Sequence, residues 1–201
     1  AVAEGGSPAF YAGEVGQSLA VFSQQNGGFF KLSDLAAQQA QWGQPLVGQY
    51  RDLTLYQTPA PTQGFTVLQM LKLVEPFEFH RMDLLDPQRI HCMVQAKQIS
   101  YHDRDRWLGD PAFADVPMDM LLSDAYLDKR RQLIDPHHAL AWDKVPSYGS
   151  LTGDTVYIAT VDAQGQAVSL IHSLYGAFGS GMVDEATGVL LQNRSAYFSL
   201  T

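Results

Sequence analysis

The sequence is poor in cysteine, in basic residues and in long apolar runs. Its one cysteine among 201 residues, Cys92, excludes an internal disulfide framework. The chain has 13 Lys and Arg against 21 Asp and Glu, which gives a formal net charge of −8 at pH 7. This acidic balance disfavours nucleic acid as a partner and leaves no polybasic patch for a membrane surface. No apolar run approaches the roughly 18 residues that a membrane-spanning helix needs.

Apolar residues are plentiful even though they do not form long runs. They make up 46% of the chain, which is enough for a substantial core in one large domain or two small ones. The first residues are small and polar and do not resemble a signal peptide. Neither end carries a boundary signal, so we expect a piece of a longer protein. Its compartment stays open, because an export signal would lie outside the piece.

Helical patterns fill the first two thirds of the chain. Asp86 and Pro87 suit the N-cap and the first position of a helix, and the two prolines of the 59–64 segment indicate a rigid loop. The predicted helices are 10–25, 35–41, 65–74, 86–103, 118–122 and 123–133. A strand is predicted over 50–58, and the segment from Asp135 to Leu151 is irregular enough to indicate a linker or processing loop.

Strand patterns dominate the end of the chain. Residues 155–161 are rich in Thr, Val, Tyr and Ile, which favour strands. A turn at 163–166 and a second strand over 167–174 complete a predicted hairpin. Helices in the first part and antiparallel strands in the last part indicate the α+β class.

A Gly-Asp step precedes the threonine that opens this hairpin. Cleavage between Asp154 and Thr155 would leave Thr155 with a free α-amine and a hydroxyl on one residue. That pair is a complete nucleophile and base. A threonine at the start of a strand is more often only a strand residue, so at this point both interpretations stay open.

Short motifs follow one another in a fixed order along essentially the whole chain. They are Phe10-Tyr11 with Gly13, Asn26-Gly27-Gly28, Ser33-Asp34-Leu35-Ala36, Gln49-Tyr50-Arg51, Pro59-Ala60-Pro61, Asp103-Arg104, Leu108-Gly109-Asp110-Pro111, Thr155 to Asp162, Gly165, Ala167-Val168-Ser169, Phe178-Gly179-Ser180-Gly181 and Gly188-Val189-Leu190-Leu191. Together they resemble the gamma-glutamyltranspeptidase family of N-terminal-nucleophile hydrolases.

The resemblance implies a precursor that cuts itself just before Thr155 and keeps both products in a four-layer αββα fold. Residues 1–154 would then be the C-terminal part of the large-subunit region, with a processing linker at about 135–154. Residues 155–201 would start the small subunit, within one structural domain overall. The implied partners are the two subunits of one precursor, a small gamma-glutamyl or other acyl amide, and water or an amine as acceptor. No cofactor is implied.

The resemblance also assigns roles to single residues. Thr155 matches the nucleophile, and Ser173 takes the place of a second Thr that hydrogen-bonds it. Tyr175 stands where an Asn usually helps to hold the glutamyl carboxylate. Asn193 is a further substrate-binding candidate. The plainer alternatives are strand packing for Ser173, a pocket wall or core position for Tyr175 and a turn cap for Asn193.

The stretch after Leu191 departs from the family pattern. The family carries paired carboxylates where Ala196 and Tyr197 stand here, and the second one binds the α-ammonium of the substrate. An α-ammonium buried without an acceptor costs several kcal/mol, so their loss removes the preference for a glutamyl group. Arg194, at a position where the family has Gln or Glu, offers a fork for an anionic acyl tail. The alternative interpretation of Arg194 is a surface ion pair. Tyr197 is also a substrate-binding candidate.

We therefore expect an acylase-like amide hydrolase or acyl transferase that forms an acyl-enzyme on Thr155. The alternative is a non-catalytic or truncated relative that acts as a structural or binding domain. Metal binding is not expected. Asp103, Asp105 and Asp110 lie among arginines that favour internal salt bridges, and the histidines lack ligand spacing.

Overall fold

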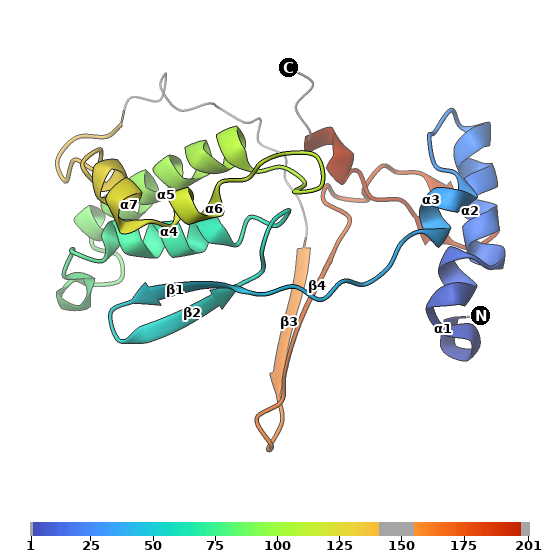
Figure 1. The fold of residues 1–201 in the computed structure, drawn as a ribbon, viewed down its shortest axis with the longest axis horizontal. Helices are drawn as coiled ribbons and strands as arrows, with labels where there is room; N and C mark the ends of the chain where they lie inside the picture. Colours follow the sequence, from blue (N-terminus) through green and yellow to red (C-terminus); the bar gives the residue numbers. More distant parts are fainter. Residues whose placement is uncertain (1, 141–154, 198–201) are drawn as a thin grey trace. The chain divides into compact units, whose positions relative to one another are not determined.

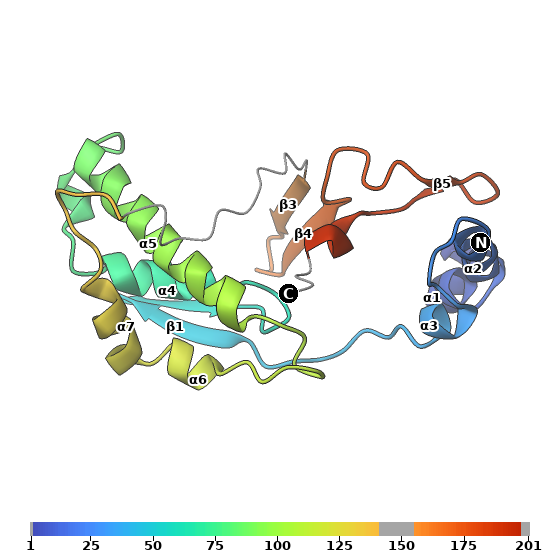
Figure 2. The same ribbon diagram turned by 90° about the horizontal axis from the view of Figure 1, so that it is seen from above.

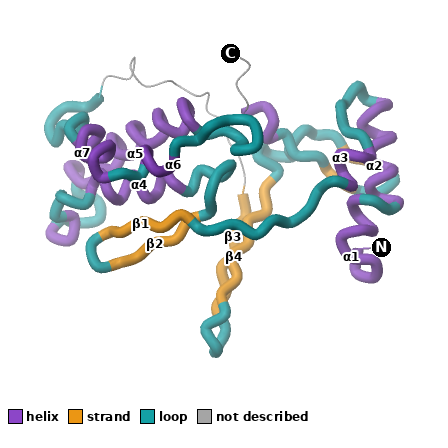
Figure 3. Tube along the Cα trace, in the orientation of Figure 1, coloured by secondary structure: helices purple, strands orange, loops and turns teal. Residues whose placement is uncertain are grey.

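The computed structural model of the protein describes residues 2–140 and 155–197 (Figure 1). Its contacts divide the chain into two compact units. One unit is Gln41–Tyr148, and the other joins Ala1–Ala40 to Gly149–Thr201. The described strands form three antiparallel pairs, and Figure 3 shows them among a larger share of helix. Helices combined with antiparallel strands confirm the α+β prediction.

The Gln41–Tyr148 unit begins with a hairpin in place of the single strand predicted over 50–58. Strands β1 (Leu46–Tyr50) and β2 (Leu53–Gln57) pair with Leu46 opposite Gln57. The chain reverses at Arg51, which has a φ of 55°. The Glu75 carboxylate holds this turn by accepting the Arg51 backbone N–H at 2.7 Å. The prediction was wrong because a partner distant in sequence, rather than a Gly or Asn in the turn, stabilises the reversal.

Helix α4 (Phe65–Val74) has the bounds that were predicted, and it lies against β1 and against α5 (Figures 1 and 2). Its apolar residues form a core with α5, with Phe79 before α5 and with Ile134 further along the chain. The buried members are Leu73, Val74, Phe79, Cys92, Ala96, Ile99 and Ile134. Burial raises the pKa of the Cys92 thiol, as expected for a small core residue rather than a reactive one.

Helix α5 (Pro87–Trp107) starts where the sequence predicts and extends four residues beyond the predicted end at 103. The Asp86 side chain accepts the N–H groups of Gln88 and Arg89 at 2.8 and 3.2 Å, so it is the N-cap. The short 3-10 helix η1 (Phe79–Arg81) precedes it. Helices α6 (Met118–Leu121) and α7 (Asp124–Arg131) follow, close to their predicted ranges.

A buried carboxylate joins α5 to α4 and α7. Asp103 is 1% exposed. It accepts hydrogen bonds from Arg130 Nη2 at 2.7 Å, Tyr126 Oη at 2.9 Å and Gln69 Nε2 at 3.2 Å. An internal salt bridge was expected here, but the cation comes from α7 and not from the neighbours in sequence. Arg104 instead pairs with Asp105 at 2.8 Å.

The other unit opens with three helices where two were predicted. They are α1 (Val2–Tyr11), α2 (Glu14–Gln25) and α3 (Leu32–Ala36). The predicted helix over 10–25 is broken at Gly13, whose ψ of −157° is extended rather than helical. Only a glycine fits there, because a Cβ would lie 2.6 Å from the Ala9 carbonyl oxygen. Helix α3 begins three residues before its predicted start at Leu35, since the Asp34 carboxylate accepts the Lys31 backbone N–H at 2.9 Å.

The predicted C-terminal hairpin is confirmed. Strands β3 (Thr155–Val161) and β4 (Ala167–Ser173) pair with Thr155 opposite Ser173 and Val161 opposite Ala167. A shorter pair, β5 (Val183–Asp184) and β6 (Val189–Leu190), and the 3-10 helix η3 (Arg194–Tyr197) follow. The four-layer arrangement stays a prediction. Within residues 2–140 and 155–197, no helix has both the length and the apolar character to cross a bilayer.

Candidate functional site

The candidate site lies where β4 ends and the chain turns away from the hairpin. The Ser173 Oγ accepts the backbone N–H of Tyr175 at 3.0 Å. This local bond accompanies a left-handed backbone at Tyr175, whose φ is 78°. Such a conformation is uncommon for a residue with a bulky side chain and often marks a functional segment.

The turn then packs closely against residues 191–192. Gly179 has a φ of 55°, and a Cβ there would lie 2.4 Å from the Leu191 carbonyl oxygen. The same oxygen accepts the backbone N–H of Ser180 at 2.9 Å and its hydroxyl at 2.8 Å. Gly179-Ser180-Gly181 therefore allows a close backbone approach, and it positions the chain that leads to Asn193.

Asn193 ties the two segments together. Its Oδ1 accepts the Gly176 N–H at 2.9 Å, and its own N–H donates to the Leu174 carbonyl at 3.2 Å. A Cβ at Gly176 would lie 2.9 Å from Asn193 Nδ2, so the glycine makes room for the amide. These bonds agree with the turn-capping interpretation of Asn193, and they place its side chain beside the end of β4.

Arg194 completes the group of side chains. Its Nη2 donates to Ser173 Oγ at 3.0 Å, and its guanidinium carbon lies 5.0 Å from the centre of the Tyr175 ring. Its backbone N–H donates to Gln192 Oε1. The structure thus brings together four residues that the sequence singles out. They are Ser173, Tyr175, Asn193 and Arg194.

The remaining predicted residues are placed less fully. Thr155 begins β3 directly opposite Ser173 in the strand register. Tyr197 is the last residue of η3. Asp154, the other half of the predicted cleavage site, lies outside the described residues.

Sequence reasoning missed Asp184, which anchors this region to α2. Asp184 is 4% exposed, and its Oδ2 accepts the hydroxyls of Thr187 at 2.6 Å and Ser18 at 2.8 Å. The Thr187 bond first, and then the Ser18 bond, hold the pKa of Asp184 below its ordinary value. The Asp-x-x-Thr spacing was a weak signal, but the partner on α2 lies 166 residues away.

The acidic residues considered for metal binding are engaged elsewhere. Asp103 and Asp105 pair with arginines, and Asp110 accepts the Ala112 backbone N–H at 2.9 Å. The exposed His138 pairs with Asp135 at 3.0 Å. Across the described ranges, no cluster of three or more His, Cys, Asp or Glu side chains could hold a metal ion.

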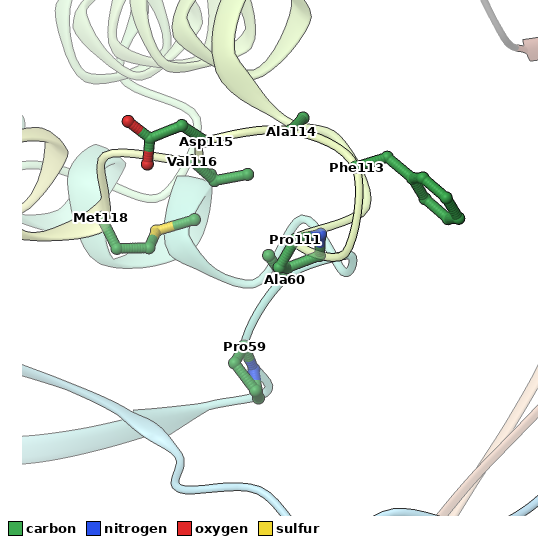
Figure 4. A pocket seen from close by; sticks show the side chains of 8 residues that line it. All are labelled: Pro59, Ala60, Pro111, Phe113, Ala114, Asp115, Val116 and Met118. Carbon is green, nitrogen blue, oxygen red and sulfur yellow. The ribbon is translucent and has the colours of Figure 1, made fainter.

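The Gln41–Tyr148 unit has an open cavity of about 570 Å³. It lies between the proline-rich loop after β2 and the loop before α6 (Figure 4). Its lining is Pro59, Ala60, Pro111, Phe113, Ala114, Asp115, Val116 and Met118. Asp115 is the one ionisable residue in that lining, and none of the predicted site residues belongs to it.

The sequence of this chain matches a known protein family. The family model for gamma-glutamyltranspeptidase matches residues 1–201. The chain therefore belongs to the gamma-glutamyltranspeptidase family, as its motifs predict.

The relatives of this chain include proteins named as hydrolases and a protein named as an acylase. The chain is 40% identical over 200 residues to a glutathione hydrolase-like proenzyme of Bacillus subtilis, covering 99% of the chain and 37% of the relative. It is 36% identical over 199 residues to an oxamate amidohydrolase proenzyme of Klebsiella pneumoniae, with 99% and 37% covered. The crystal structure of a cephalosporin acylase from Bacillus halodurans superimposes with a TM-score of 0.85 at 34% identity, over 98% of the chain and 35% of the acylase. The chain thus spans little more than a third of each of these relatives.

Proposed function

We propose that the protein carrying this chain is a self-cleaving amide hydrolase with Thr155 as its N-terminal nucleophile. The observation that carries the proposal is the position of Thr155, which begins β3 directly opposite Ser173. The side chains of Tyr175 and Arg194 meet at that same Ser173 end of β4. Membership of a family with proenzyme relatives supports the same interpretation.

In the self-cleavage step, the Thr155 hydroxyl oxygen attacks the carbonyl carbon of Asp154. The C–N bond of the peptide breaks as the C–O ester bond forms, and the nitrogen takes up the hydroxyl proton. Water then hydrolyses the ester. This leaves a carboxylate on Asp154 and a free α-amine and hydroxyl on Thr155. Residues 1–154 and 155–201 would then belong to the large- and small-subunit regions.

In turnover, the same hydroxyl attacks the carbonyl carbon of an amide substrate. The neutral α-amine of Thr155 accepts the hydroxyl proton and passes it to the leaving amine as the C–N bond breaks. The acyl group remains on Thr155 as an ester. Water or an acceptor amine then attacks that ester and releases the acyl group.

We assign the acyl group to the acylase type, which lacks an α-ammonium. Ala196 and Tyr197 provide no carboxylate at the positions where the family binds that ammonium. Arg194 is an exposed cation beside Ser173 and suits an anionic acyl tail. Tyr175 and Asn193 would contact the same acyl group, and similarity to a cephalosporin acylase supports the acylase assignment.

Intact-mass analysis of the full-length protein tests the nucleophile. The unmodified protein should divide into two chains at the 154/155 bond. Thr155→Ala should remain one chain, whereas Thr155→Ser, which keeps a hydroxyl, should still divide. Cleavage of the Thr155→Ala variant at the same bond would refute the assignment. A protein that never divides would favour a non-catalytic binding or structural relative.

The acyl preference is tested with two anilides of equal chain length. Glutaryl anilide carries an anionic tail without an α-amine, and gamma-glutamyl anilide carries both groups. We expect a higher kcat/KM on the glutaryl compound. Much faster hydrolysis of the gamma-glutamyl compound would contradict the acylase assignment and leave the nucleophile assignment intact.

A further inference from the structure

One of the two compact units is built from both sides of the proposed cleavage site. It joins Ala1–Ala40 to Gly149–Thr201, whereas Gln41–Tyr148 forms the other unit by itself. Cleavage of the 154/155 bond would therefore leave the first unit composed of two separate chains. The contact between helix α2 and strand β5 (Figure 2) would then be a contact between the large-subunit and small-subunit regions.

A buried carboxylate lies at the contact between α2 and β5. Asp184, on β5, is 4% exposed, and its Oδ2 accepts the hydroxyl of Ser18, on α2, at 2.8 Å. Ser18 is itself half-buried. A carboxylate that is taken out of water needs hydrogen-bond donors to offset the loss of its hydration. Asp184 would therefore lose one of its donors if α2 moved away.

The turn after β5 holds the carboxylate in place for this contact. The Asp184 carbonyl accepts the N–H groups of Thr187 at 3.2 Å and of Gly188 at 2.7 Å. The Thr187 hydroxyl donates to Asp184 Oδ2 at 2.6 Å. All of these bonds lie within residues 184–188 and would stay within one chain after cleavage, whereas the bond from Ser18 would join the two chains.

We infer that Ser18 and Asp184 form a latch between the two subunits of the processed protein. The inference rests on the proposed cleavage at the 154/155 bond. A hydrogen bond to an ionised group is about twice as strong as a neutral one. Removing one partner of a buried pair of this kind increases the rate at which a complex dissociates. The latch therefore slows the release of the small subunit from the large one.

Release of the small subunit measures the latch directly. The processed, full-length protein is immobilised through its large subunit, and free small subunit is followed at one sub-denaturing urea concentration. We expect Ser18→Ala to speed release about 10- to 100-fold, as for the loss of a hydrogen bond to a charged group. Alanine favours helices, so melting of α2 would not explain this change. Ser18→Thr, which keeps the hydroxyl, should be released at close to the unmodified rate.

Ser33→Ala is the matched control. Ser33 lies on α3 in the same unit, and its exposed hydroxyl bonds to its neighbour Asp34 at 3.5 Å, so its loss should leave the release rate unchanged. A double-mutant cycle tests the pairing itself. In an Asp184→Asn background, Ser18→Ala should cause little further acceleration, because the charge that strengthens the bond is gone.

Two results would overturn the inference. One is release of Ser18→Ala at the unmodified rate. The other is an equal acceleration by Ser18→Ala with and without the Asp184 charge, because the two residues would then not act as a pair. Failure of the proposed function looks different, since intact-mass analysis would find a single chain. A protease site introduced at the 154/155 bond would supply the same break in that chain, and release would then be measured as before.

Discussion

Replacing Arg130 by methionine tests how far burial determines the strength of an ion pair in this protein. Arg130 Nη2 and Asp103 Oδ1 are 2.7 Å apart, and the Asp103 side chain is 2% exposed. Arg81 and Glu78 have the same separation, 2.7 Å, but their side chains are 69% and 56% exposed. The two pairs share a separation and join an arginine to a carboxylate, but Arg81 and Glu78 are exposed neighbours in sequence, whereas Arg130 and Asp103 are 27 residues apart and Asp103 is buried.

The expected losses follow from that difference. Arg130→Met leaves the Asp103 carboxylate with neutral donors from Tyr126 and Gln69, and breaking a buried pair in this way costs about 3–5 kcal/mol. Arg81→Met should change stability by about 0.5 kcal/mol or less, since water already solvates both partners. In the Arg130→Met background, Asp103→Asn removes the stranded charge and should recover about 1–3 kcal/mol.

Urea unfolding of the full-length protein measures these differences. Hydrogen exchange of peptides from α5 and α7 locates the loss in the helices that the pair joins. The reasoning fails if Arg130→Met and Arg81→Met destabilise the protein equally. It fails also if the double variant is less stable than Arg130→Met alone, because the charge would then not be the cause.

Three further outcomes follow from single contacts. Gly179→Ala should destabilise the turn by about 1–3 kcal/mol, because it adds a Cβ at 2.4 Å from the Leu191 oxygen to a left-handed backbone. Faster hydrogen exchange in the turn would show this loss, and an unchanged exchange rate would contradict it. The Thr187 hydroxyl, first among its contacts, holds the pKa of Asp184 low. The contribution of this carboxylate to stability is therefore present above the unfolded pKa of about 3.9 and is lost as the pH falls through the folded pKa. The stability of Asp184→Asn should fall less steeply with acid than that of the unmodified protein, and identical acid unfolding profiles would contradict this. Burial first, and then the hydrogen bond to Asp103, raises the pKa of Tyr126 to about 12. The contribution of the protonated phenol to stability is therefore present below about pH 10 and declines as the pH rises through the folded pKa. Ultraviolet titration of the protein and of Tyr126→Phe should show one phenol that ionises above about pH 10, and ionisation of Tyr126 near pH 10 would refute this prediction.

Local signals in the sequence predict the elements that depend on local interactions. The bounds of α4 follow from its apolar run after a glycine, and Asp86 caps α5 through its own neighbours in sequence. The β3–β4 hairpin is predicted by β-branched residues around a turn. One element that was wrong depends on a distant partner, whereas the break at Gly13 and the early start of α3 involve near neighbours in sequence. The Arg51 turn is held by Glu75, 24 residues away. Arg104, the first residue of α5 beyond its predicted end, donates to Gln63 Oε1 at 3.0 Å.

In the candidate site, too, local motifs are predictable from the sequence and contacts between distant residues are not. The family resemblance predicts a set of site residues, and four of them, Ser173, Tyr175, Asn193 and Arg194, lie together at the end of β4. The motifs do not predict that Arg194 bonds to Ser173, because the two lie 21 residues apart and meet only after the Gly179 turn packs against Leu191. The expectation for Arg194 was a substrate contact or a surface ion pair, and the structure adds a hydroxyl and an aromatic ring as its neighbours.

The β3–β4 hairpin explains why the chemistry has to be tested in the full-length protein. Tyr157 pairs with Ile171 on one face, and these side chains are 60% and 65% exposed. Ile158 pairs with Leu170 on the opposite face, at 48% and 52% exposure. Apolar residues on both faces are typical of a sheet that other layers cover on both sides, as in the four-layer arrangement that the family resemblance implies. Left uncovered, such a hairpin favours self-association over a defined pocket, so inactivity of the isolated chain would say nothing about Thr155.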